Sequence, residues 1–158
     1  MGGSTLELWT NRLEGLQVPE VHVLDRDVPP PEPAKYQGAA DRVNARGDNC
    51  RSFITNKREM ENYIHFEAIN EEFEIQLTEN FQAFDDVPVM VAKAVHDASQ
   101  STVDWEDLDE KKRDKKESKA KKRLNRAAVS NMTKVRLDSA DPDGEVLTWL
   151  REISRHLL

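Results

Sequence analysis

Three acidic side chains in two short segments have the residue types and spacing of a site for a hard divalent cation. Asp25 ends the apolar run 21–25, and Asp27 follows two residues later. In a strand, residues i and i+2 project to the same side, so this pair offers the oxygen ligands that Mg²⁺ or Mn²⁺ prefers. Sites in α/β sheets form beyond the carboxyl ends of strands, where this pair falls. The alternative is an ordinary turn, with Asp27 as a cap and Arg26 paired to a neighbour.

The third acid, Glu61, belongs to the segment KREMENY, residues 57–63, which directly follows a second apolar run at 51–55. Neighbouring parallel strands end on the same edge of a sheet, so Glu59 or Glu61 is expected near the two aspartates. The basic residues of the same segment are then placed to face a phosphate. The alternative is a solvated first helical turn whose glutamates favour the helix dipole.

The elements that must position these residues alternate between helix and strand. Apolar spacing, a Pro-rich loop and Gly47 predict a helix over 5–15, a strand over 21–25, a loop over 28–33, a helix over 36–46 and a strand over 51–55. This order is typical of an α/β fold with a parallel sheet flanked by helices.

The rest of the chain predicts a helical C-terminal region. We expect a short helix over 57–64 continuing through 67–75, helices over 87–98 and 107–128, an extended piece over 134–137, a turn over 138–144 and a closing helix over 145–157. The helix over 107–128 is highly charged with little apolar stripe, so we do not expect it to be packed deeply. Two domains follow from this division, 1–66 and 67–158.

The segment 111–126, KKRDKKESKAKKRLNR, contains ten Lys or Arg and two acids, although the whole chain has a net charge of −7. Such a segment is suited to phosphate contacts and predicts salt-sensitive DNA binding without sequence preference. No aromatic residue interleaves with the lysines, so base stacking is not expected. The alternative is a solvated helix laced with salt bridges.

Composition excludes several classes. The single cysteine, Cys50, cannot form a disulfide within the chain, and a reducing cytoplasm is the simplest compartment. No apolar run approaches the length of a membrane span, and the first residues lack the pattern of a signal peptide. We therefore expect a cytoplasmic protein with no membrane partner.

The run VHVLDRD, the Pro-rich loop and the segment CRSFITNKREMENYI together resemble the TOPRIM domain of the OLD (overcoming lysogenization defect) family of nucleases. Members of that family join an ABC-type ATPase to a C-terminal TOPRIM nuclease. The resemblance covers residues 2–66 and implies a partial TOPRIM-like sheet. It implies metal ligands at Asp25, Asp27 and Glu61, with catalytic parts for Glu59 and Lys134.

Phosphodiester hydrolysis with two Mg²⁺ or Mn²⁺ ions, acting on DNA, is the activity that the resemblance implies. The family's opening strand carries a glutamate, commonly within V-E-G, and this sequence has no counterpart before Gly2. It also has no G-x-x-x-x-G-K-[ST] motif, so ATP enters only through a missing ATPase domain. We therefore expect the distal part of a nuclease, with weak or no cleavage alone. A homodimer and an association with an ATPase region both stay open.

Two other functions remain. The first is a non-catalytic DNA-binding or interaction remnant of a TOPRIM protein. The second is another TOPRIM enzyme, such as a primase or topoisomerase. The segment 58–63, of the form R-E-x-E-N-Y, and the absence of a topoisomerase-type tyrosine context make this second alternative the weaker one.

Overall fold

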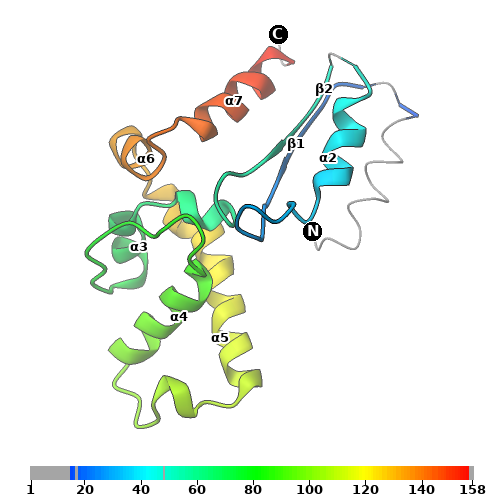
Figure 1. Cartoon of the computed structure of the whole chain (residues 1–158). Helices are drawn as coiled ribbons and strands as arrows, with labels where there is room; N and C mark the ends of the chain where they lie inside the picture. The colour runs from blue at the N-terminus through cyan, green and yellow to red at the C-terminus, as the bar shows by residue number, and fades with distance from the viewer. Residues whose placement is uncertain (1–14, 17, 48, 157–158) are drawn as a thin grey trace. The chain divides into compact units, whose positions relative to one another are not determined.

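The computed structural model describes residues 15–16, 18–47 and 49–156 (Figure 1). The chain divides into two compact units, described here separately: Met1–Glu59 with Asp143–Leu158, and Met60–Pro142. The domains expected over 1–66 and 67–158 do not coincide with these units, because the last helix groups with the N-terminal part. The helix expected over 5–15 lies outside the described residues, apart from Gly15, which is in a turn.

The first unit is built on two parallel strands, as the alternation of helix and strand predicted. Strand β1 (Glu20–Leu24) pairs with β2 (Cys50–Ile54), and Leu24 lies opposite Ile54. Each strand lies one residue before the run that the sequence indicated. The expected α/β class is confirmed at this level.

Helix α2 (Gln37–Asn44) connects the two strands and packs against both (Figure 1). Ala39, Ala40 and Val43 form its buried face. Beyond the helix, Gly47 has a φ of +115°, which residues with a Cβ rarely adopt. The expected helix over 36–46 and its glycine stop are therefore confirmed, with slightly shorter bounds.

Helix α7 (Glu145–Arg155) confirms the expected closing helix and packs against β1. It buries Trp149, whereas Leu150 and Ile153, from the apolar face that the sequence suggested, are exposed. The Glu145 carboxylate accepts a hydrogen bond from the backbone N–H of Asn56 at 3.0 Å. This bond joins α7 to the loop that follows β2.

The second unit is helical. It contains α3 (Phe66–Phe73), α4 (Val87–Ala98), α5 (Glu110–Arg123) and α6 (Lys134–Ala140), with 3-10 turns η2 (Met60–Tyr63) and η3 (Trp105–Asp107) and the π-helical turn η4 (Leu124–Ala128). Its apolar core gathers buried side chains from α3, α4, α5 and η4, including Ile69, Val87, Val91, Leu124 and Ala128. The helices expected over 67–75 and 87–98 are thus present, but 57–64 forms only the short turn η2.

The expectation that the charged helix is not packed deeply was wrong for its C-terminal half. Ala120, Leu124 and Ala128 recur every four residues and are all buried, with Leu124 fully inaccessible. This spacing places them on one face, which packs against α4 along α5 and against α3 at η4. A narrow stripe of small and aliphatic residues is therefore enough to pack this helix against α4 and α3, although its other faces are charged.

The expectation of an extended piece over 134–137 was also wrong, because these residues begin α6. The Thr133 hydroxyl accepts a hydrogen bond from the Arg136 N–H at 3.3 Å and caps the helix. Arg136 also bonds to Glu71 at 2.6 Å and to Glu67 at 3.3 Å, both on α3. The helix is too short to show periodicity, so its cap was the better signal.

Candidate functional site

Three hydrogen bonds tie the end of β1 to the end of β2 in the first unit. The Thr55 N–H donates to the Leu24 carbonyl at 3.0 Å, and the Arg26 N–H donates to the Thr55 hydroxyl at 2.9 Å. The Asp27 N–H then donates to the Arg58 carbonyl at 2.9 Å. The segment holding both aspartates therefore lies directly beside the segment that leads to Glu59, as the parallel sheet predicted.

Thr55 is the residue at this edge that the sequence analysis missed. It is fully buried, and its hydroxyl accepts from Arg26 while donating to the Lys57 carbonyl at 2.7 Å. One side chain thus fixes the start of both loops. A hydroxyl-bearing residue directly after an apolar strand was the available signal, because such a side chain pairs readily with loop backbone.

Valine at position 55 should destabilise the first unit by about 1–3 kcal/mol, because it leaves the Arg26 N–H and the Lys57 carbonyl without their partner. Valine matches threonine in shape, so packing contributes little to this change. Urea unfolding followed by circular dichroism measures the effect. The matched control is Thr148→Val, whose hydroxyl donates to the Gly144 carbonyl on exposed α7 and should change stability by less than about 0.5 kcal/mol. Equal effects of the two substitutions would contradict the structural part assigned to Thr55.

Asp27 has a backbone φ of +64°, a left-handed conformation that aspartate tolerates better than most residues. Because β1 ends at Leu24, Asp25 and Asp27 lie outside the strand, and the expectation that strand alternation places them on one side was wrong. The Asp27 carboxylate lies 3.1 Å from the Lys35 ammonium, and its side chain is 33% exposed. Tyr36 and Asp27, as hydrogen-bond partners, raise the pKa of Lys35.

Glu59 closes the first unit and is buried. Glu61 begins the second unit, and its surroundings there are well defined. It is 2% exposed, and its Oε1 accepts a hydrogen bond from the Asn125 amide at 2.6 Å. The Lys121 ammonium lies 3.4 Å from the same oxygen. Within its own unit, Glu61 therefore balances part of the charge of the basic segment.

Lys134 is the first residue of α6 in the second unit. Its ammonium lies 2.6 Å from the Asp138 carboxylate one turn later, and its side chain is largely exposed. An exposed pair of this kind contributes little to stability and leaves the lysine able to change partners.

The described residues contain no group of three or more His, Cys, Asp or Glu side chains arranged to hold a metal ion. The strand ends do bring together the right donor chemistry, since Asp25 and Asp27 are half-buried carboxylates in a loop adjoining Glu59. Carboxylate oxygens suit Mg²⁺ or Mn²⁺. A cation bound here would have to replace Lys35 as the partner of Asp27.

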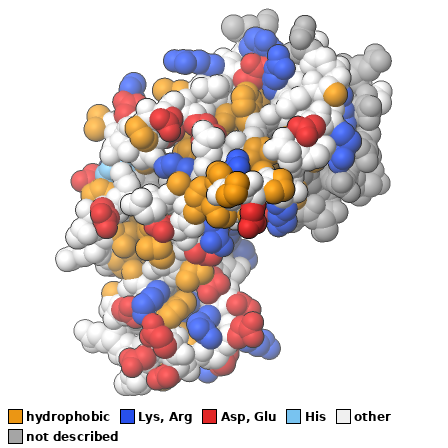
Figure 2. Space-filling model, in the orientation of Figure 1, with side chains coloured by type: hydrophobic (Ala, Val, Ile, Leu, Met, Phe, Trp, Pro, Cys, Tyr) orange, Lys and Arg blue, Asp and Glu red, His pale blue; other side chains and the backbone are white. Residues whose placement is uncertain are grey.

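Part of the basic segment is neutralised within the second unit. Salt bridges join Lys112 to Asp109 at 3.0 Å and Arg123 to Glu72 at 2.7 Å, in addition to the pair between Lys121 and Glu61. Figure 2 shows acidic and basic side chains interspersed over the face in view. The positive charge of this segment is therefore partly balanced by internal acids.

No protein-family model, no curated protein and no solved structure matches the chain. What the structure defines is an α/β protein with a two-stranded parallel sheet in one unit and a helical second unit. Among the helices of the described ranges, none is both long and apolar enough to cross a membrane.

Proposed function

We propose that this chain contains the metal-binding part of a DNA endonuclease that hydrolyses phosphodiesters, of the OLD type and with a TOPRIM-like core. The observation that supports it most is the hydrogen bond from Asp27 to Arg58, which joins the two segments on which the resemblance rests. This edge brings Asp25 and Asp27, whose carboxylates suit a divalent cation, beside the segment ending in Glu59.

In this proposal Asp25 and Asp27 hold Mg²⁺ or Mn²⁺, and Glu59, in the same unit, is the catalytic acid. The part of Glu61 as a further ligand rests on the resemblance alone. A bound divalent cation supplies an activated water and neutralises charge on the phosphate. Lys134 stabilises the charge that develops on the scissile phosphate. The basic segment 111–126 contacts the DNA backbone, and any use of ATP belongs to a separate ATPase region.

Plasmid nicking tests this function. Supercoiled DNA incubated with Mn²⁺ should be converted slowly to nicked circles, and EDTA should stop the conversion. The double variant Asp25→Asn with Asp27→Asn should be inactive, whereas Asp41→Asn with Asp143→Asn, which removes two exposed acids of the same unit, should be unaffected. Nicking that persists in EDTA, or in the first variant, would refute the proposal.

The second candidate function is a non-catalytic DNA-binding protein that retains the core. The buried Glu61 favours it, because its Oε1 is already hydrogen-bonded to Asn125 and lies near Lys121. Absence of metal-dependent nicking at every protein concentration, with DNA binding retained, would favour this alternative over the nuclease.

A further inference from the structure

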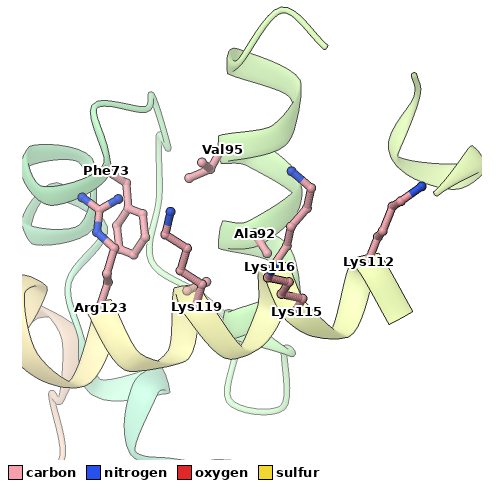
Figure 3. A pocket seen from close by; sticks show the side chains of 9 residues that line it. Phe73, Ala92, Val95, Lys112, Lys115, Lys116, Lys119 and Arg123 are labelled. Carbon is pink, nitrogen blue, oxygen red and sulfur yellow. The ribbon is translucent and has the colours of Figure 1, made fainter. Parts of the chain in front are cut away.

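The second unit contains a pocket of about 320 Å³ between the end of α3, helix α4 and helix α5 (Figure 3). Its apolar lining comes from Phe73 on α3, Ala92 and Val95 on α4, and Ala120 on α5. This volume lies at the small end of the range for ligand pockets. It suits one compact group with an apolar face.

The remaining lining residues are all cations and none is an acid: Lys112, Lys115, Lys116, Lys119 and Arg123. The acids of α5 do not line the pocket. Lys112 and Arg123 have carboxylate partners, but Lys115, Lys116 and Lys119 form no salt bridge with any described residue. An apolar pocket bordered by lysines without a salt-bridge partner is complementary to an anion that also has an apolar surface.

The fold adds an aromatic ring that the sequence pattern of the basic segment lacked. Phe73 lines the pocket beside α5, and the Arg123 guanidinium lies 4.3 Å from the centre of its ring. Figure 3 shows the two side chains next to each other. Arg123 is held in place by Glu72, to whose carboxylate it bonds at 2.7 Å. Aromatic and guanidinium planes are the groups on which proteins bind unpaired bases, so Phe73 and Arg123 give the pocket a surface for a base that the segment 111–126 alone does not offer.

We propose that this pocket binds one unpaired base of a single DNA strand, with the flanking phosphates on Lys115, Lys116 and Lys119. This inference rests on the proposed function, which makes DNA the ligand. Lys115 and Lys119 lie about one helical turn apart, roughly 6 Å along the helix axis, so both can contact phosphates of the same strand. A duplex presents only base edges in its grooves, whereas an unpaired nucleotide can place a whole apolar face in the pocket.

Fluorescence anisotropy with two labelled strands separates base contacts from phosphate contacts. One probe is an oligothymidylate of about twelve nucleotides, and the other is an abasic strand of equal length with the same phosphates. All titrations contain EDTA. We expect the oligothymidylate to bind about tenfold more tightly than the abasic strand. Equal affinity for the two probes would overturn the inference.

Two lysine pairs on α5 test the phosphate contacts. Lys115→Ala with Lys119→Ala should weaken binding of both probes by about tenfold or more and reduce the dependence on salt. The control, Lys111→Ala with Lys122→Ala, removes the same charge from exposed positions outside the pocket and should cost less than about threefold. If both pairs lose the same affinity, DNA binding depends only on the total charge of α5. This result would overturn the inference.

A substitution on α4 tests the pocket without changing the lysines. Val95→Glu places a carboxylate in the lining and should abolish the preference for the oligothymidylate, whereas Met90→Glu, on the same helix but outside the lining, should preserve it. Thermal melting confirms that each variant is folded. Preference retained in Val95→Glu, or selective binding of an acidic amphipathic peptide in place of DNA, would overturn the inference. Because metal is absent, failure here is distinct from failure of Mn²⁺-dependent nicking.

Discussion

Replacing Asp25 and Asp27 together by asparagine is expected to weaken Mn²⁺ binding by at least about 100-fold, measured by isothermal titration calorimetry. Loss of groups that merely orient metal ligands costs about 10–100-fold in affinity, so removal of two ligands should exceed that range. Asparagine keeps the size of aspartate and one of its acceptor oxygens but removes its charge. The expected loss is therefore one of coordination, with the loop conformation retained.

Loop geometry provides the reason to expect a folded variant. The three hydrogen bonds described between the strand ends use backbone groups and the Thr55 hydroxyl, and none of these three involves an aspartate carboxylate. The control pair Asp41→Asn with Asp143→Asn changes net charge equally and should leave the dissociation constant within about twofold. Unchanged affinity in the first pair would exclude these aspartates as ligands.

Alanine at position 61 is expected to destabilise the second unit by about 2–3 kcal/mol, because it removes a buried side chain and one of the two hydrogen bonds that the Asn125 amide donates. Lys121 adds little to this cost, since its side chain is 46% exposed and regains water when the carboxylate is lost. The effect is a property of the second unit in the absence of metal.

Denaturant unfolding in EDTA measures the change in the free energy of unfolding caused by Glu61→Ala. Two further variants serve as comparisons. Glu61→Gln keeps an oxygen for Asn125 and should cost about 1 kcal/mol or less. Glu79→Ala removes an exposed glutamate of the same unit and should fall within about 0.5 kcal/mol of the parent chain. If Glu61→Ala is as stable as Glu79→Ala, the contacts assigned to Glu61 do not contribute to folding.

The structural features that could be predicted from the sequence are those set by residues close together in the chain. The apolar runs that became β1 and β2, the Gly47 stop and the spacing of α4 are all set within a few residues. Parallel pairing followed from the helix between the strands. The adjacency of the segments holding Asp27 and Arg58 was predictable for the same reason, since parallel strands end together.

The parts that were missed depend on contacts between distant residues. Asn125 and Lys121 meet Glu61 across more than half of the second unit's sequence, and no spacing rule connects them. Phe73 reaches the cations of α5 only because α3 packs against η4, which continues α5. The burial of Leu124 likewise depends on its partners, since a narrow apolar stripe looks weak until another helix covers it.

Paramagnetic broadening by Mn²⁺ tests the central claim most directly, because it locates the bound cation along the chain. In a two-dimensional amide spectrum of the full chain, substoichiometric Mn²⁺ should first erase the signals of residues 25–28 and 57–59. Signals of α4 should persist under the same conditions. Broadening centred on other acidic segments, with residues 25–28 unchanged, would contradict a metal site at the ends of β1 and β2.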